Sequence, residues 1–299
     1  MSKKKFINIV WLKRDLRLTD HPPLYNAIQK QEDFLILYIY EPSLMHDVHY
    51  DERHGKFIEQ SLSAIQEELI KYDKKLTVVS GEAVEIFQFL IDKYFIKNIF
   101  SHEETGLKIT YSRDLELKIL FAKYSITWTE YQSNAVIRGL SNRKNWEKHW
   151  NNVMRLPIDK INLKQAPIIH HDFSRNSLPS FSDKKYYQKG GFKCARNELK
   201  SFFIDRGGEY FKNISKPEKS RYNCSRLSPY ISYGNISIKE IYKELLKSWD
   251  RPGWRRSMVA LSSRLHWHCH FIQKFESEIS IEFEPVNIGY KNFPYLITD

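Results

Sequence analysis

The first 130 residues alternate short apolar runs with segments of helical periodicity. The apolar runs are rich in β-branched and aromatic residues and predict five strands, at 6–11, 34–40, 76–79, 99–101 and 126–128. Between the strands, apolar residues recur every three or four positions, which predicts helices that each bury one stripe. The predicted stripes are Phe57, Leu62, Ile65 and Leu69; Val84, Phe87, Ile91 and Tyr94; and Tyr111, Leu115, Ile119 and Ala122.

Strands that alternate with helices of this length predict an α/β fold. We expect a five-stranded parallel, Rossmann-like sheet, whose ligands bind at the carboxyl ends of the strands. Residues 157–191 then show little periodicity and are rich in Pro, Ser, Asn, Lys and His, which is typical of an interdomain linker. Only helices are predicted after it, at 194–204, 237–248 and 255–275, with a capping box at Ser237 and Glu240.

The chain is therefore predicted to have three parts. These are an α/β domain at 1–135, an interdomain linker at 136–190 and an incomplete all-helical domain at 191–299. No apolar run approaches the ~20 residues of a membrane-spanning helix, and residues 1–5 lead into a strand without a signal peptide. We expect a cytoplasmic protein that does not contact a membrane.

Cysteine and glycine patterns exclude several classes of protein. Cys194, Cys224 and Cys269 are an odd number of widely separated thiols, which argues against a disulfide framework and against a thiolate zinc site. The eleven glycines form neither the dinucleotide fingerprint nor a Walker phosphate loop. A plain NAD enzyme and a P-loop ATPase are therefore not expected.

The net charge of +11 and the pI near 9.3 predict a surface that attracts polyanions. Nucleic acid is the leading candidate for a macromolecular partner. Aromatic residues make up 14% of the chain, and several Trp and Tyr lie in its basic second half. There they could stack on bases or on a flavin, or they could pack in the core.

A charged loop follows the first strand, at its carboxyl edge. It contains Arg14, Asp15, Arg17 and Asp20, and Asp20 stands where it can cap a helix that starts at Pro22-Pro23. We expect a rigid loop in which these four charges satisfy one another.

A second polar segment, residues 224–234, contains a predicted helix start at Ser228. The free amides and the positive dipole end of a helix favour an anion, and Ser225, Arg226 and Ser228 add donors around the same point. The segment fits a diphosphate cradle, although most helix starts of this type are structural.

The last predicted helix carries three histidines near a tryptophan. His266 and His270 share one face and could hold a metal, but no third ligand lies nearby, so we predict no metal site. His268 points away from that pair. Trp267 beside Arg264 and His268 suits a surface that stacks on bases and contacts phosphates, the alternative being a tryptophan in the core.

Taken in this order, the segments resemble the DNA photolyase and cryptochrome family. The opening W-L-K-R-D-L-R-L-T-D-H-P-P-L is similar to that family's first strand and turn, and S-R-L-S-P-Y-I-S-Y-G-N-I-S is similar to its flavin-diphosphate segment. The resemblance runs from residue 7 to about residue 290. It implies an α/β domain docked on a helical domain that holds FAD in a folded conformation.

The resemblance also implies a lyase activity and the residues that serve it. Reduced flavin would donate an electron under blue light to a pyrimidine dimer flipped out of DNA, as in a deoxyribodipyrimidine photolyase. DNA that contains such dimers would be the partner of a monomeric flavoprotein, with Arg264, Trp267 and His268 on the DNA side. An antenna chromophore of unknown identity could bind the N-terminal domain. The implied FAD contacts are Tyr210, Cys224, Ser225, Arg226, Leu227 and Ser228.

Several positions depart from the family pattern. Cys224 stands where the family usually has Thr, Arg264 where its repair enzymes commonly place a Glu that binds the damaged base, and His268 where an Arg is usual. Ile109 and Thr110 do not reproduce the polar pair of the folate antenna pocket. Two alternatives to repair therefore stay open: a cryptochrome-like blue-light photosensor without repair activity, and an inactive, basic nucleic-acid-binding fragment.

Length is the largest departure. Family members continue well past residue 299, with helices that supply the electron-transfer tryptophans. We expect a truncated member whose electron-transfer residues lie beyond the chain end.

Overall fold

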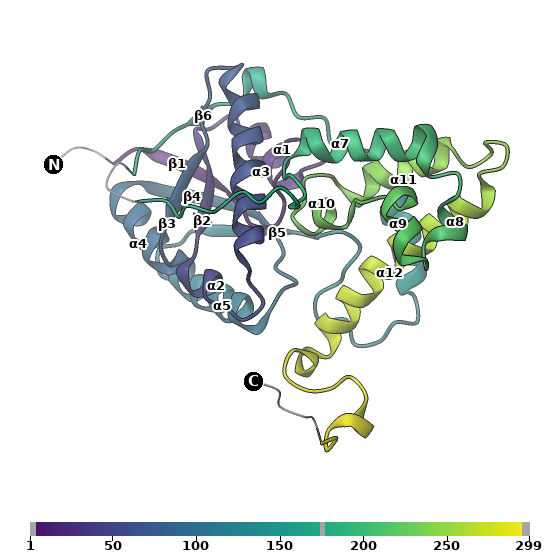
Figure 1. Cartoon of the computed structure of the whole chain (residues 1–299). Helices are drawn as coiled ribbons and strands as arrows, with labels where there is room; N and C mark the ends of the chain where they lie inside the picture. Colours follow the sequence, from purple (N-terminus) through teal and green to yellow (C-terminus); the bar gives the residue numbers. More distant parts are fainter. Residues whose placement is uncertain (1–3, 174–176, 295–299) are drawn as a thin grey trace.

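The structure, a computed structural model, describes residues 4–173 and 177–294. An α/β unit is followed by a helical unit, and a long irregular segment runs between them along one side of the molecule (Figure 1). All strand pairs are parallel, in the order β3-β2-β1-β4-β5, with β6 also paired to β2. The strands are Phe6–Leu12 (β1), Phe34–Tyr40 (β2), Thr77–Ser80 (β3), Phe95–His102 (β4), Thr127–Tyr131 (β5) and Ile168–Ile169 (β6).

The five strands predicted from the apolar runs are confirmed, and they form the predicted parallel sheet. β2 is buried along its whole length because helices cover both faces of a parallel sheet. One core lies between the sheet and the helices Pro22–Gln29 (α1) and Glu52–Ile70 (α3), and the other lies under Ala83–Lys93 (α4) and Lys108–Lys123 (α5). Pro42–Met45 (α2) is a single turn after β2.

The predicted stripe of α5 is wrong. Tyr111, Leu115 and Ile119 are exposed, and the buried face of the helix carries other side chains instead. The buried residues are Thr110, Asp114, Leu117 and Phe121. Asp114 is buried because Lys13 from the end of β1 forms an ion pair with it at 2.8 Å. The ion pair between Lys13 and Asp114 therefore determines which face of α5 packs against the sheet.

A pair of substitutions tests this assignment. Leu117 is fully buried and Ile119 is 73% exposed. Leu117→Ala is expected to lower the free energy of unfolding by about 2 kcal/mol or more, because it leaves a cavity, whereas Ile119→Ala should have little effect. Urea denaturation followed by circular dichroism measures both. Equal losses in the two variants would contradict the observed orientation of α5.

The helical unit has its own apolar core. Its helices are Trp146–Arg155 (α6), Phe192–Ser201 (α7), Tyr210–Asn213 (α8), Pro217–Asn223 (α9), Ser228–Ser232 (α10), Ile238–Lys247 (α11) and Arg255–Ser277 (α12). The capping box predicted at the start of α11 is confirmed, with the Glu240 amide donating to Ser237 Oγ at 3.1 Å. No helix among the described residues is long and apolar enough to cross a membrane.

The segment predicted as a linker at 136–190 is in part structured. It contains α6, whose Trp146, Trp150 and Met154 pack into the core of the helical unit, and the short strand β6. β6 pairs with the first two residues of β2, where β3 does not reach. The division at 1–135, 136–190 and 191–299 stays a prediction, since the helical core begins before residue 191.

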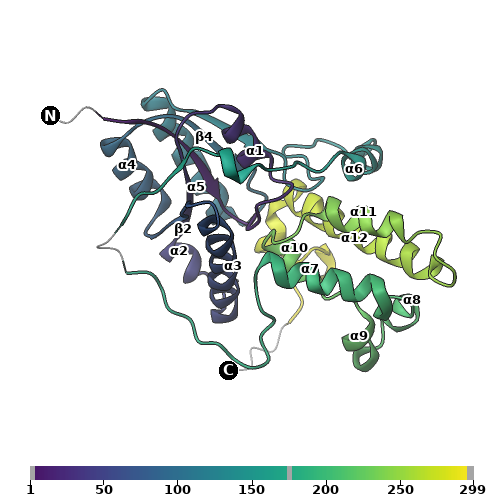
Figure 2. The ribbon, with the colours of Figure 1, turned by 90° about the horizontal axis from the view of Figure 1, so that it is seen from above.

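The part of this segment that leads to α7 passes around the outer side of α3 (Figure 2), and Phe181 and Gly190 contact that helix. Phe181 packs against Tyr40, with ring centroids 5.9 Å apart, and against Gly55 of α3. A Cβ at Gly55 would lie 2.1 Å from the Phe181 ring, so only glycine admits this contact. The Gly190 amide then donates to Gln60 at 2.8 Å, which fixes the end of the segment to α3.

One residue after α10 connects three segments across the boundary between the units. The Asn235 side chain donates to the Leu16 carbonyl at 3.0 Å and accepts from Ser61 at 3.2 Å and from the Gly191 amide at 3.1 Å. The Leu16 amide also donates to the Tyr233 carbonyl at 3.0 Å. The turn after β1, the helix α3 and the start of α7 are therefore held at one buried amide.

Candidate functional site

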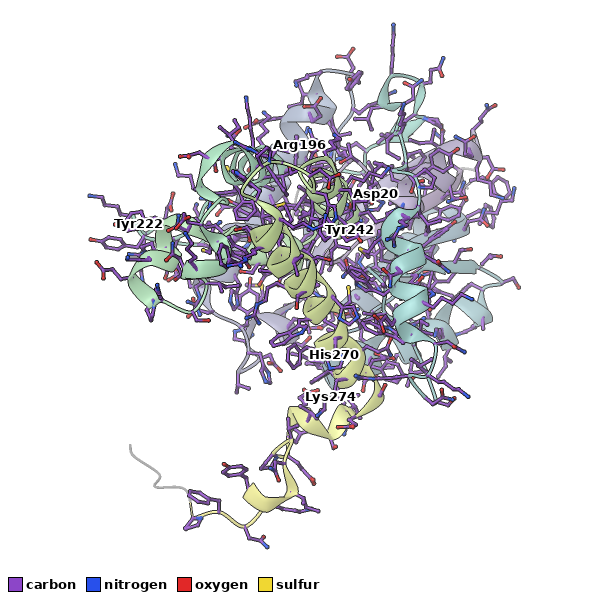
Figure 3. The ribbon with its side chains drawn as sticks, turned by 90° about the vertical axis from the view of Figure 1, so that its right-hand side faces the viewer. Asp20, Arg196, Tyr222, Tyr242, His270 and Lys274 are labelled. Carbon is purple, nitrogen blue, oxygen red and sulfur yellow. The ribbon has the colours of Figure 1, made fainter. Side chains whose placement is uncertain are left out.

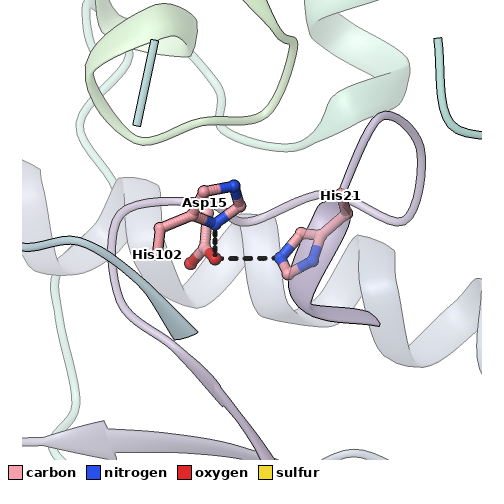
Figure 4. Close-up of side chains that lie close together, drawn as sticks. All are labelled: Asp15, His21 and His102. Atoms are coloured by element: carbon pink, nitrogen blue, oxygen red, sulfur yellow. Dashed lines mark hydrogen bonds and ion pairs between the residues drawn. The ribbon is translucent and has the colours of Figure 1, made fainter. Parts of the chain in front are cut away.

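A buried carboxylate organises the turn after β1 (Figure 4). Asp15 Oδ2 accepts a hydrogen bond from His102 Nδ1 at 2.6 Å and lies 2.9 Å from His21 Nε2, and its Oδ1 accepts from the Lys13 amide at 2.7 Å. Burial acts to raise the pKa of Asp15, but the attraction of His21 and the hydrogen bond from His102 outweigh it and hold the pKa well below its usual range. Asp15 is therefore ionised at neutral pH.

The donor set of this cluster does not suit a metal ion. Asp15, His21 and His102 are the one group of three close His, Cys, Asp or Glu ligands in the described part of the chain. His21 Nδ1 accepts the Leu24 amide hydrogen at 3.1 Å, so the ring proton is on Nε2, which faces Asp15 at 2.9 Å. A protonated nitrogen has no lone pair for a metal. The cluster fixes the turn and caps α1.

The predicted pairing within the charged loop is wrong. Arg14 pairs with Glu104 at 2.9 Å, and Asp20 pairs with Lys239 of α11 at 2.7 Å. Arg17 donates to the backbone carbonyls of Asp20 and Gly234, and His21 instead of Asp20 caps α1. The loop therefore binds the helical unit through Arg17 and Asp20, a role that spacing along one segment could not reveal.

The segment predicted as a diphosphate cradle is divided by the fold. Ser228 begins α10, as predicted, and lines an open cavity of about 570 Å³ together with Arg14, Arg53, Tyr187 and Tyr233. Arg226 and Ser225 do not line this cavity. Arg226 adopts a left-handed φ of 57°, and its guanidinium lies 3.6 Å from Glu198.

The residues before Ser228 are held by a second arginine. Arg206 donates to the carbonyl oxygens of Cys224 and Ser225 and pairs with Glu198. Leu227 is buried in the helical core. Arg206 therefore holds the backbone at Cys224 and Ser225 by bonding both of their carbonyl oxygens.

Tyr210 lies close to two of the other predicted site residues. Burial raises the pKa of its hydroxyl to about 12, Arg264 acts to lower it and Cys224 acts to raise it. Its ring packs edge-on against Phe202 at 5.4 Å. Tyr210, Cys224 and Arg264 therefore lie near one another in the helical unit.

Trp267 is exposed, which excludes the alternative of a tryptophan buried in the core. It is 46% exposed on the outer face of α12, and the Arg264 guanidinium lies 4.4 Å from its ring centroid. Phe271, one turn later, packs edge-on against it at 6.0 Å. Figure 3 shows His270 and Lys274 on the last turns of the same helix, and Tyr222 at the periphery of the unit. An aromatic ring covered by a guanidinium can stack on a base.

The histidines of α12 lie in two environments. His266 packs edge-on against Trp146 and Trp150, at 5.0 and 5.1 Å, and His270 against Trp146 at 6.0 Å. His268 instead lines a cavity of about 370 Å³ between the two units, where its buried Nε2 has no hydrogen-bond partner. Burial there lowers the pKa of His268 to about 4.

A pocket of about 300 Å³ lies at the carboxyl ends of β1, β2 and β4. Its walls are apolar and aromatic, and its floor is charged. The alternation of strands and helices predicts ligands at this edge of the sheet, but it does not indicate which residues line the pocket. The principal lining residues are Trp11, Tyr38, Tyr40, Leu44, Met45, Tyr50, Ile58, Leu107 and Tyr233 for the walls, and Glu41, Glu104, Thr110 and Arg113 for the floor.

The floor of this sheet-end pocket is an ion-pair network around one arginine. Arg113 of α5 lies 2.6 Å from Glu41, 3.2 Å from Glu104 and 2.8 Å from Asp114. Burial raises the pKa of Glu41 to about 7, against the attraction of Arg113. Glu104 behaves oppositely: burial acts to raise its pKa, but Arg14, Lys13 and Arg113 lower it to about 2.

Comparisons with known proteins agree with this architecture. Residues 8–145 match the family model described as DNA photolyase. A deoxyribodipyrimidine photo-lyase of Buchnera aphidicola is 26% identical over 262 residues, which cover 81% of this chain and 53% of the relative. The chain therefore spans about half the length of that curated relative.

Two solved structures share the fold. The cryptochrome of Synechocystis sp. PCC6803 superposes with a TM-score of 0.79 at 19% identity and covers 100% of this chain and 67% of its own. An archaeal photolyase from Sulfolobus tokodaii, described with two FAD molecules, superposes with a TM-score of 0.72 at 19% identity. The superposition covers 97% of this chain and 64% of the photolyase chain. Residues 8–145 therefore match the DNA photolyase family, and the whole chain has the fold of the photolyase and cryptochrome structures.

Proposed function

We propose that this chain functions as a flavin-dependent, blue-light-driven photolyase that repairs pyrimidine dimers in DNA. The observation that carries the proposal is the open cavity at the start of α10, which is lined by Ser228, Arg14 and Arg53. A hydroxyl and two guanidinium groups are donors that an FAD diphosphate requires. The known structure with two FAD molecules, which has the same fold, supports a flavin as the ligand.

Two different surfaces of the chain would bind FAD and DNA. Bound FAD supplies the electron on illumination. Ser228, Arg14 and Arg53 would hold its diphosphate, and Tyr210 would border the flavin. The Arg264–Trp267 stack would receive a base on the DNA side.

The charge distribution supports DNA as the partner of the helical unit. Residues 1–135 hold 18 Lys and Arg against 20 Asp and Glu, whereas residues 136–299 hold 29 against 16. The positive charge of the protein therefore lies in the part that carries the Arg264–Trp267 stack. Phosphate binding to such a surface weakens as salt rises.

Equilibrium dialysis of the purified chain against FAD tests the cavity. We expect Arg53→Ala to weaken FAD binding about tenfold, because a charged hydrogen bond is lost. Arg221→Ala, which removes an exposed arginine of α9 outside the cavity, should bind as the unchanged protein does. Equal affinities of the two variants would place FAD elsewhere, and a chain that takes up no FAD would overturn the proposal.

Photosensing without repair is the second candidate, and Arg264 favours it. A guanidinium only donates hydrogen bonds, so Arg264 cannot accept one from the damaged base. Loss of dimers from DNA under blue light, and none in darkness, distinguishes repair from photosensing. If the chain binds FAD but leaves the dimers intact, photosensing is the better assignment.

A second chromophore fits the sheet-end pocket. The pocket has aromatic walls, lies at the carboxyl ends of parallel strands and has the volume of a small-molecule site. We propose that it holds an antenna chromophore, a planar molecule that would pass its excitation energy to the flavin.

A further inference from the structure

The chain that leads to α7 is attached to the rest of the protein at two points, with a short turn between them. Before the turn, the Ser182 amide donates to Glu52 Oε1 at 3.0 Å. After the turn, Gln188 Nε2 donates to the Arg226 carbonyl at 2.8 Å. The first attachment is to α3 of the α/β unit and the second is to the segment before α10. Residues 183–187 therefore span from one unit to the other.

The turn is held mainly by contacts within itself. The Tyr187 amide donates to the Lys184 carbonyl at 2.9 Å, and the Lys184 ammonium lies 5.7 Å from the Tyr187 ring centroid. Tyr186 is 90% exposed. In the described part of the chain, no hydrogen bond joins residues 183–187 to another element, although Lys184 is attracted to the acidic start of α3. The turn can therefore move while its two attachments stay in place.

This turn borders the open cavity at the start of α10. Tyr186 and Tyr187 line the cavity together with Arg53 and Ser228. Residues 183–187 read Asp-Lys-Lys-Tyr-Tyr, so two ammonium groups and two aromatic rings accompany a single carboxylate. Ammonium groups bind phosphate, and aromatic rings stack on heteroaromatic rings. The turn therefore carries both kinds of group that bind an anionic nucleotide.

We propose that residues 183–187 form a lid, which closes over a dinucleotide in the α10 cavity and slows its release. The ring of Tyr186 stacks on a heteroaromatic ring of the ligand, and the ammonium group of Lys185 pairs with the diphosphate. Ser182 and Gln188 stay attached, and the backbone beside them absorbs the movement. This inference rests on the proposed FAD site and adds to it the segment that retains the ligand.

Closure of this turn has a small cost and a clear gain. The two attachments already limit the conformations of the turn, so little further conformational entropy is lost when it closes. The closed lid excludes water from the cavity, which strengthens the attraction of Arg14 and Arg53 for the diphosphate. Because the open cavity admits the ligand freely, the lid changes the rate of dissociation more than the rate of association.

Limited proteolysis of the full chain tests the movement. Lys184 and Lys185 are exposed in a turn, where trypsin cleaves readily. We expect saturating FAD to slow cleavage after both lysines about tenfold, because cleavage follows the population of the open turn. Cleavage after Lys291, which is exposed and does not line the cavity, should keep its rate. Mass spectrometry of the fragments measures each site separately.

Stopped-flow flavin fluorescence measures the effect of the lid on release. Tyr186→Ala is expected to speed the dissociation of FAD about tenfold, because the stacked ring is lost. Tyr186→Phe keeps the ring and should release FAD as the unchanged protein does. Tyr222→Ala removes a tyrosine that is 71% exposed and does not line this cavity, so it should also leave the dissociation rate unchanged.

The outcomes separate the lid from the proposed function. Slower cleavage with FAD, together with faster release from Tyr186→Ala alone, supports the lid. If FAD binds but neither rate responds, the FAD site stands and the lid is refuted. If FAD does not bind, the proposed function fails, and saturating pyrophosphate then tests the lid by itself. Unchanged cleavage after Lys184 and Lys185 in pyrophosphate would refute the lid as well, whereas slower cleavage would support its closure over a smaller anion.

Discussion

Replacing Asp15 with alanine is expected to lower the free energy of unfolding by about 4 kcal/mol. The substitution removes the buried acceptor of His102 Nδ1 and of the Lys13 amide and leaves both donors without a partner in a buried site. The turn after β1 also carries the contacts to the helical unit, so its loss should loosen the boundary between the units. Urea denaturation at pH 7.5, followed by tryptophan fluorescence, measures the change.

Two further variants show whether the charge or the contact matters. Asp250→Ala removes a carboxylate that is 95% exposed and should have no measurable effect. Asp15→Asn keeps the shape and one acceptor but removes the charge. Its loss in the free energy of unfolding should lie between the losses of Asp15→Ala and Asp250→Ala. An alanine variant as stable as the unchanged protein would show that the cluster does not hold the turn.

The same cluster predicts how stability depends on pH. Burial lowers the pKa of His102 to about 4, so the ring is neutral in the folded protein, while in the unfolded chain it titrates near its ordinary value of about 6.5. The unfolded state therefore binds more protons than the folded state between pH 6.5 and 4. The free energy of unfolding falls as the pH is lowered through that window. The carboxylate of Asp15, whose pKa is depressed, keeps its contribution until the pH falls below about 4.

The sheet could be predicted because its strands are buried on both faces. A strand such as β2, with seven buried residues in succession, appears as an uninterrupted apolar run whatever its neighbours are. The buried face of α5 could not be predicted, because it includes Asp114, whose burial depends on Lys13, 101 positions earlier in the sequence. A rule that places apolar residues inside fails wherever an ion pair enters the core.

The candidate sites show the same limit. The start of α10 was predictable from Ser228 and Pro229, since that signal is local. The contribution of Arg53 to the same cavity was not, because α3 and α10 meet only in the folded chain. Likewise, Glu41 and Arg113 are 72 positions apart, and nothing in the sequence near either one indicates the other.

Gly234→Ala is expected to lower the free energy of unfolding by about 3 kcal/mol, because two unfavourable effects add at this position. The residue follows α10 with a left-handed φ of 66°, which disfavours any side chain. A Cβ would also lie 2.4 Å from the Arg14 carbonyl oxygen and 2.4 Å from the Asp15 Cα. Both are backbone atoms of the turn that Asp15 fixes, so the overlap can be relieved only by parting the two units.

Gly253→Ala is the matched control for that substitution. Gly253 has a left-handed φ of 79°, and a Cβ there would meet nothing within 4 Å. Gly253→Ala should therefore lower the free energy of unfolding only by the backbone penalty, about 1 kcal/mol. The difference between the two variants in urea denaturation isolates the close approach of the units. Equal costs would mean that the boundary yields freely, and the cavity at α10, which takes Arg14 and Arg53 from one unit and Ser228 from the other, would then lack a fixed geometry.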